Sequence, residues 1–196
     1  MVTDFCPGGD IRSLISQHRL ATGHNYLPED HARVYLAEIL IAIEDLHKNG
    51  IVHRDIKPEN VLIDQKGHAL LSDFGLAKEG LFEQKMTDTM LGGGQSYQIP
   101  EVLLGKKYGK SVDLFLYGAL AFEMMTGEQA FPFLNDEEEH NERIKTCVFH
   151  FPDEPGYKEL FKKMNIPLPS VERNAKITDD INQSEQEISG FMESQE

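Results

Sequence analysis

The amino-acid sequence predicts a mainly α-helical fold with short β-hairpins, and three features of the sequence support this prediction. Apolar residues recur at helical spacing between residues 36 and 46. A second run with the same spacing covers residues 112–122 and stops at Gly127, a residue type that often ends helices. Between these two runs, residues 51–73 alternate short apolar stretches with polar turns, which is typical of small antiparallel strands.

Two helices and a loop are predicted before these strands. The CPGGD turn at residues 6–10 follows a short extended segment, and the apolar residues within 11–15 have the spacing of a short helix. Pro28 lies where a longer helix begins, and the KNG sequence ends that helix. Because Val34 and Ile41 widen its apolar stripe, we expect the longer helix to be buried on most sides.

The second half of the sequence is predicted to contain one central helix. Residues 80–98 have no sustained period and include LGGGQ, so they are predicted to form a mobile loop. The helix that follows carries Asp113 and Glu123 among its apolar residues, and such charges are unusual in a central helix. The acidic run at residues 136–139 suits the start of a solvated helix. Residues 152–196 are polar, which predicts an extended or partly disordered tail.

Composition narrows the possible partners and compartments. The chain has 196 residues, of which 40% are apolar, and this is enough for one domain with a sizeable core. Its 33 acidic and 19 basic residues give a formal net charge of −14, which argues against a nucleic acid or an anionic membrane surface as the main partner. The sequence shows no apolar signal segment and no long uncharged run, so we expect a soluble, cytoplasmic protein without a membrane span.

The positions of cysteine and histidine give no metal or disulfide pattern. Cys6 and Cys147 lie far apart in the sequence, so neither a disulfide framework nor a zinc site is indicated. The histidines outside the central loop follow no ligand spacing and are expected at the surface or in packing contacts; they are His18, His24, His31, His47, His68, His140 and His150.

The stretch IVHRDIKPENVLID at residues 51–64 crowds ionisable and amide side chains between apolar flanks. Two buried strands joined by a polar loop explain the flanks, but they do not explain the choice of loop residues. Asp55 and Asn60 lie in this loop and Asp73 lies in the next one, so their oxygens are expected to converge as ligands for Mg²⁺. Lys57 would then contact a phosphate, and Asp55 would orient a hydroxyl and accept its proton.

The HRDIKPEN sequence, together with DFG and IPE, resembles the catalytic loop, magnesium loop and activation-segment end of eukaryotic protein kinases. The stretches DFCPGGDI, LPEDHARVYLAEIL, HKNGIVHRDIKPENVLID and LSDFGLAKEG are most similar to the AGC group, and Lys57 supports serine/threonine over tyrosine specificity. The resemblance implies a partial kinase domain over residues 1–151, made of the hinge and the large C-terminal lobe. Residues 152–196 resemble a shortened form of the C-terminal extension of that group.

This resemblance implies a serine/threonine protein kinase that uses ATP and Mg²⁺ and favours protein substrates with basic residues near the target hydroxyl. Asp55 is the implied catalytic base, and Lys57 is implied to contact the transferred phosphate. Asn60 and Asp73 are the implied magnesium ligands. The residues implied to bind the nucleotide are Phe5, Cys6, Asp10 and Leu62.

Other residues match positions that bind substrate or organise the loops of the family. Glu59 and Glu123 match two acidic positions that, in basophilic relatives, receive an arginine two residues before the phosphorylated site; the alternative is that both are solvated surface charges. The residues implied for the activation segment, on which an upstream kinase can act, are Arg54, Thr87, Thr89 and Glu101. His53 is implied to pack and hydrogen-bond within the catalytic loop, and Asp113 to be a buried acceptor for backbone N–H groups of that loop.

The activation segment departs from the family pattern. Met90 stands where a phosphorylated threonine is usual, Gly94 stands where a threonine braces the catalytic aspartate, and Ile99 replaces an alanine. Glu101 normally pairs with an arginine of later helices, which we expect to be missing here, and a lone buried carboxylate would be costly. The candidate replacements for that arginine are Arg143 and Arg173.

The first residues of the sequence resemble the hinge between the two lobes of a kinase. We therefore expect the small lobe, with its glycine-rich loop and strand lysine, to be absent, and the chain alone to be a poor catalyst. The alternative to a kinase is a noncatalytic module that docks basic peptides or another kinase through Glu59 and Glu123.

Overall fold

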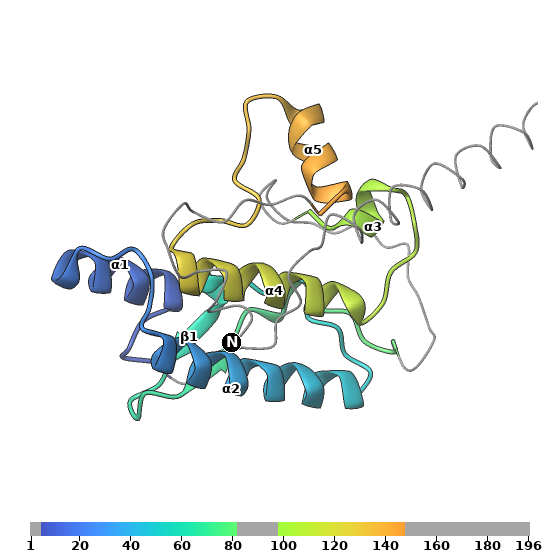
Figure 1. Ribbon diagram of the computed structural model, residues 1–196. Helices are drawn as coiled ribbons and strands as arrows, with labels where there is room; N and C mark the ends of the chain where they lie inside the picture. The colour runs from blue at the N-terminus through green and yellow to red at the C-terminus, as the bar shows by residue number, and fades with distance from the viewer. Residues whose placement is uncertain (1–4, 82–97, 148–196) are drawn as a thin grey trace, which may run out of the picture.

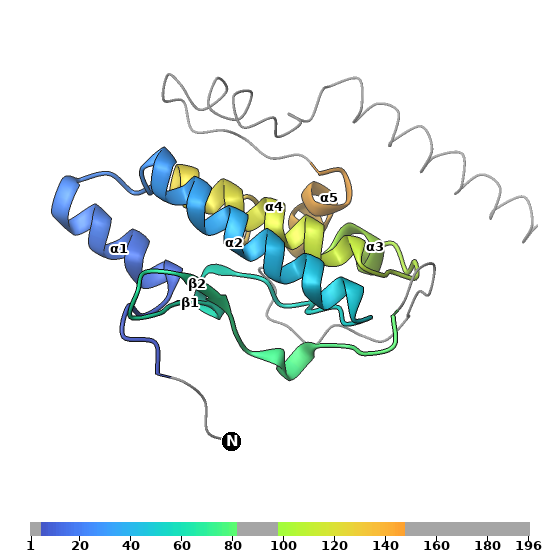
Figure 2. The same ribbon diagram turned by 90° about the horizontal axis from the view of Figure 1, so that it is seen from below.

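Two long helices, α2 (Glu29–Lys48) and α4 (Ser111–Thr126), lie side by side at the centre of the molecule (Figures 1 and 2). The structure is a computed structural model, and it describes residues 5–81 and 98–147. The predicted mobile loop, apart from its ends, and the predicted tail lie outside these residues. The two helices match the two apolar runs of the sequence, so the prediction of a mainly α-helical fold is confirmed.

The shorter helices surround this central pair. Helix α1 (Ile11–Thr22) lies at one end of it, and α5 (Glu137–Lys145) lies on the opposite side of α4 from α2 (Figure 1). The single-turn helix α3 (Pro100–Leu103) packs against α5. Every helix within residues 5–81 and 98–147 is too short or too polar to span a bilayer.

Side-chain caps and glycines set the ends of the helices. Asp10 caps α1, because its carboxylate accepts a hydrogen bond from the backbone N–H of Ser13 at 2.7 Å. Asp136 caps α5 in the same way, and acidic residues in the first turn suit the helix dipole. Gly127 ends α4 with φ of 73°, and a Cβ atom at this position would lie 2.1 Å from the carbonyl oxygen of Asn25. Only glycine fits this helix end.

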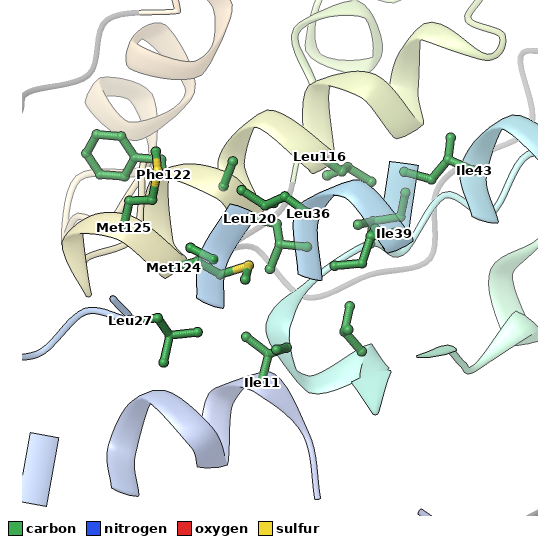
Figure 3. Close-up of a cluster of buried hydrophobic side chains, with 14 of the residues drawn as sticks. Ile11, Leu27, Leu36, Ile39, Ile43, Leu116, Leu120, Phe122, Met124 and Met125 are labelled. Carbon is green, nitrogen blue, oxygen red and sulfur yellow. The ribbon is translucent and has the colours of Figure 1, made fainter. Parts of the chain in front are cut away.

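The core lies between α2 and α4 (Figure 3). In that view, Leu36 and Ile39 of α2 point toward Leu116 and Leu120 of α4. All four side chains are buried, and removing each from water contributes about 1.5 to 3 kcal/mol of free energy. The α4 helix is buried over most of its length, and this agrees with its predicted central position.

The prediction that α2 is buried on most sides is wrong. Val34 and Ile41 are 55% and 65% exposed. They lie seven residues apart and so share one face, whereas Leu36, Ile39 and Ile43 form the stripe that packs against α4. These two residues widen the apolar pattern in the sequence, but no element within residues 5–81 and 98–147 covers them.

A two-stranded antiparallel sheet packs against α2 (Figure 2). Strand β1 (Val61–Ile63) pairs with β2 (Ala69–Leu71). One residue beyond the last pair, the backbone N–H of Ser72 donates to the carbonyl oxygen of Asn60 at 2.8 Å. The end of the loop before β1 and the start of the loop after β2 are therefore held together.

The segment before α1 also pairs with the sheet. The backbone N–H of Ile63 donates to the carbonyl oxygen of Gly9 at 2.8 Å, and the backbone N–H of Gly8 donates to the carbonyl oxygen of Ile63 at 3.1 Å. Asp10 and Leu62 form a bridge between the two segments. A second bridge joins Val52 to Lys78. The hinge-like segment therefore runs beside β1, while the two predicted loops leave the hairpin at its open end, where Ser72 meets Asn60.

Candidate active site

Asp113 of α4 anchors the start of the predicted catalytic loop. Its carboxylate is fully buried and accepts hydrogen bonds from the backbone N–H groups of His53 at 2.9 Å and Arg54 at 2.8 Å. His47, at the end of α2, places Nε2 2.8 Å from the same carboxylate. A buried carboxylate is stable only with such partners. These bonds hold Arg54 at φ of 70°, a left-handed conformation that is uncommon outside glycine.

His53 links the two predicted loops. Its Nε2 lies 3.0 Å from the carbonyl oxygen of Ser72, and the backbone N–H of Asp55 donates to its Nδ1 at 3.3 Å. These partners correspond to a neutral ring with its proton on Nε2. Burial lowers the pKa of His53, although the carboxylates of Asp113, Asp55 and Asp73 act in the opposite direction.

Asp55, Lys57 and Asn60 form one hydrogen-bonded group. The Lys57 ammonium donates to both carboxylate oxygens of Asp55, at 2.9 and 2.8 Å. The Asn60 amide nitrogen donates to Asp55 Oδ2 at 2.7 Å and to the Asp55 carbonyl oxygen at 2.8 Å. The Asp55 carboxylate is therefore fixed from two sides, and a positive charge lies beside it.

Asp73 lies next to this group on the open side of the loops. It follows Ser72, whose N–H and hydroxyl donate to the carbonyl oxygen of Asn60 at 2.8 and 2.9 Å. Asp73 is exposed, has φ of 60°, and accepts a hydrogen bond from the backbone N–H of Gly75 at 3.1 Å. The structure thus brings the backbone that carries Asp73 to Asn60, while the Asp73 side chain faces solvent.

The donor set near Asn60 and Asp73 suits one class of metal ion. Among the side chains that the structure describes, no three of His, Cys, Asp or Glu come close enough together to hold a metal. That excludes a zinc-type site from the described residues. Mg²⁺ needs only one or two protein oxygens, because phosphates and water complete its shell. An amide and a carboxylate on adjoining loops fit that requirement.

The predicted nucleotide residues lie in the segment that pairs with β1. Leu62 is half-buried and bridges to Asp10, so these two residues are brought together. One oxygen of Asp10 caps α1. Cys6 is half-buried, whereas the ring of Phe5 is 87% exposed. The exposed ring of Phe5 leaves the implied role of the Phe5 and Cys6 backbone as a prediction of the kinase resemblance.

Arg54 bridges the catalytic loop and the segment before α4. Its Nε donates to the carbonyl oxygen of Leu76 at 2.6 Å, and Nη1 donates to the hydroxyl of Tyr108 at 3.0 Å. Nothing in the sequence pattern pointed to Tyr108. The activation-segment positions Thr87 and Thr89, and the departures Met90 and Gly94, lie outside the described residues.

Glu101 and Ile99 lie at the start of α3. Glu101 is half-buried, and the hydroxyl of Ser111 lies 3.4 Å from its Oε1, so the costly arrangement of a fully buried carboxylate without a polar neighbour does not arise. Arg143 pairs instead with Glu139 of its own helix at 2.8 Å, and Arg173 lies outside the described residues. Ile99 is fully buried and belongs to the core, so the larger residue fits where the family pattern has alanine.

Arg12 of α1 joins the two predicted substrate-binding residues. Its Nε donates to Glu59 at 2.8 Å, and its Nη1 donates to Glu123. Burial opposes the charge of Arg12, but hydrogen bonds to both carboxylates and their charges outweigh it and raise the pKa of Arg12 above its ordinary value. The alternative that Glu59 and Glu123 are solvated surface charges is wrong for Glu123, because its side chain is buried.

Sequence reasoning missed the roles of Arg12 and His47. His47 was expected at the surface or in packing, yet it contacts Asp113. The sequence did hold one indication of this contact. His47 lies at the end of a helix only six residues before His53, so the turn between them can bring both residues to the same carboxylate. The expectation for His140 agrees with the structure, since it is buried and its ring lies 5.3 Å from that of Phe133.

Comparisons with known proteins agree with this arrangement. A sequence model of the protein kinase domain matches residues 1–189. Protein kinase C zeta type from Oryctolagus cuniculus is 43% identical over 141 residues, which are 72% of this chain and 23% of that protein. Atypical protein kinase C from Drosophila melanogaster is 38% identical over 148 residues, which are 76% of this chain and 23% of that protein.

A plant relative gives a similar result. Serine/threonine-protein kinase AtPK1/AtPK6 from Arabidopsis thaliana is 41% identical over 144 residues, which are 74% of this chain and 29% of that protein. The chain spans about a quarter of the length of the curated relatives it matches. The predicted kinase-like, mainly α-helical lobe is confirmed. The chain belongs to the protein kinase family, within its AGC group of serine/threonine kinases.

Proposed function

We propose that this chain supplies the catalytic and magnesium loops of a serine/threonine protein kinase that transfers a phosphoryl group from ATP to hydroxyls of proteins. The observation that carries this proposal is the Asp55 carboxylate, held between Lys57 and Asn60 in a loop that buried Asp113 anchors. A general base needs such fixed orientation. We further propose that residues 1–151 belong to the kinase domain and that residues 152–196 form an extension of the AGC type.

In the reaction, the hydroxyl oxygen of the substrate forms a bond to the γ-phosphorus of ATP while the bond from that phosphorus to the β-phosphate oxygen breaks. Asp55 accepts the hydroxyl proton, and ADP leaves. Asn60 and Lys57 donate four hydrogen bonds to Asp55, three to its carboxylate and one to its carbonyl oxygen, and these bonds orient the carboxylate. Lys57 is also available to pair with the transferred phosphoryl oxygens, because its charge is held beside the base.

Asn60 and Asp73 would hold Mg²⁺. The two hydrogen bonds from the Asn60 side chain to Asp55 use its nitrogen, so its carbonyl oxygen is the atom suited to the cation. Mg²⁺ held by these two residues would offset the negative charge that develops on the phosphate oxygens. The segment at residues 5–10 and Leu62 would bind the adenosine part of ATP, since both lie beside β1.

The substrate class in this proposal is a protein segment with basic residues near the target hydroxyl. The net charge of −14 and the acidic pair of Glu59 and Glu123 support it. An upstream kinase would act on the activation segment, and the kinase resemblance assigns the recognition of the added phosphate to Arg54, which contacts Leu76 and Tyr108.

The test compares Asp55→Asn with the unaltered chain in transfer of labelled phosphate from Mg-ATP to a serine peptide that contains arginines. Removing the base should lower turnover by on the order of a hundredfold or more, while Mg-ADP affinity stays within about twofold. Asp45→Asn, an exposed aspartate of α2, is the matched control and should retain full turnover. Unchanged turnover in Asp55→Asn would refute the assigned base. Peptide binding without any transfer in the unaltered chain would favour the noncatalytic module.

A further inference from the structure

One arginine bridges the two acidic residues that the proposed function assigns to substrate recognition. Arg12 lies in the first turn of α1, and its guanidinium donates to both Glu59 and Glu123. Glu59 lies in the turn that ends the catalytic loop, and Glu123 lies on α4. Three elements that are distant in the sequence therefore meet around one guanidinium.

Burial explains why this position holds a cation. The Glu123 side chain is 2% exposed, and a carboxylate shielded from water needs charged or hydrogen-bonding partners. Arg12 is 33% exposed, so it covers Glu123 from the solvent side. Its contacts with Glu59 and Glu123 use different guanidinium nitrogens, which is how arginine binds two acceptors at once.

We propose that Arg12 is a specificity-determining residue that fills the arginine subsite from within the chain. The proposal rests on the proposed function, because it takes Glu59 and Glu123 to face the substrate. With Arg12 in place, the three groups carry one net negative charge instead of two, and acceptor sites that a substrate arginine would use are taken. A substrate with a neutral residue two positions before the hydroxyl should therefore bind nearly as well as one with arginine there. Basic residues elsewhere in the substrate still benefit from the net charge of −14.

The experiment measures binding of two fluorescent serine peptides that differ only in having arginine or citrulline two residues before the serine. Fluorescence anisotropy at low salt gives the dissociation constant of each peptide. The ratio used below is that of the citrulline peptide divided by that of the arginine peptide. For the unaltered chain, we expect a ratio below about threefold. Arg12→Met should raise the preference for the arginine peptide by on the order of tenfold, because the guanidinium that now donates to both carboxylates is removed and the net charge of the three positions falls from −1 to −2. The matched control is Arg33→Met, which removes an exposed arginine paired with Glu29 on α2 and should leave the ratio unchanged.

Two results would overturn the proposal. A strong arginine preference in the unaltered chain means that Arg12 does not fill the subsite. Equal binding of both peptides to folded Arg12→Met means that the two carboxylates are no arginine subsite. Binding is independent of turnover, so neither result depends on whether Asp55 catalyses phosphate transfer.

A second variant keeps the test decisive if Arg12→Met does not fold. Glu59→Gln changes a half-exposed side chain and leaves Glu123 and Arg12 paired. If the subsite is already filled, the ratio should change by less than about twofold, because the variant removes only one partly exposed charge beside an occupied site. A clear fall in the ratio, to the disadvantage of the arginine peptide, would contradict the proposal.

Discussion

Asp113 and Glu123 are both buried carboxylates on α4, but they accept hydrogen bonds from different kinds of donor. Asp113 accepts two backbone N–H groups of the catalytic loop, and His47 adds a third contact. Glu123 is bound by the guanidinium of Arg12, which is partly exposed. Backbone donors cannot leave without unfolding the loop, whereas a side chain at the surface can swing into water.

This difference separates a structural carboxylate from an exchangeable one. The Asp113 bonds fix the left-handed turn at Arg54 that leads into the predicted catalytic base. The bond between Arg12 and Glu123 fixes no backbone and could be replaced by another guanidinium. The kind of donor, more than the degree of burial, therefore indicates which acidic residue can meet a ligand.

The largest effect is expected for Asp113→Asn. Asparagine has one acceptor oxygen, so its amide nitrogen must face a donor that the carboxylate now satisfies. We expect the free energy of unfolding to fall by about 3 to 5 kcal/mol, as measured by urea denaturation. Asp45→Asn on the exposed side of α2 is the control and should change stability by less than about 0.5 kcal/mol. A loss below about 1 kcal/mol in Asp113→Asn would show that the backbone donors find other partners.

A smaller effect is expected for Glu123→Gln, the equivalent change at the other buried carboxylate. The glutamine carbonyl oxygen can still accept from Arg12, and Arg12 keeps its contact with Glu59. The loss in unfolding free energy should be about 1 kcal/mol in the same denaturation experiment. If it equals the loss in Asp113→Asn, the distinction between fixed and exchangeable donors does not hold.

The elements that the sequence predicted well are those whose signal is local. The apolar spacing of α2 and α4 reports one buried stripe on each helix, and the hairpin follows from alternating residues beside turns. The exposure of Val34 and Ile41 was not predictable, because it depends on which elements cover α2. Sequence periodicity gives a face, but tertiary packing decides how wide the buried part of that face is.

The same limit applies to the candidate site. Asp55, Lys57 and Asn60 lie within six residues, so the motif alone predicted that they belong together. The contacts of His47 with Asp113 and of Arg12 with Glu123 join residues 66 and 111 positions apart, and no local pattern encodes such pairs. The assigned roles of all these site residues, from Asp55, Lys57 and Asn60 to Phe5, Cys6 and Asp73, stay predictions.

Glu38 of α2 combines both kinds of donor on one carboxylate. Its Oε2 accepts from the backbone N–H of Ala69 at 2.7 Å, and its Oε1 lies 2.7 Å from Nδ1 of His68. His68 is mostly exposed, and a hydrogen bond to Glu38 and its charge raise the pKa of His68 above the ordinary value of 6.5. The two contacts of Glu38 therefore compare a side-chain donor with a backbone donor at the surface, where the expected effects on stability are smallest.

We expect the charged bond between His68 and Glu38 to disappear as the pH rises, while the backbone bond from Ala69 persists. Because the pKa of His68 is higher in the folded chain than in the unfolded chain, its stabilising contribution is complete below pH 6.5 and is lost as the pH rises through the folded pKa. NMR titration should give a His68 pKa above 6.5 that returns toward 6.5 in Glu38→Gln. Exchange of the Ala69 amide should stay slow across the same range, because its hydrogen bond to Glu38 does not involve the titrating ring of His68. Faster exchange of this amide in step with His68 would mean that the titratable donor, and not the backbone donor, holds Glu38 against the hairpin.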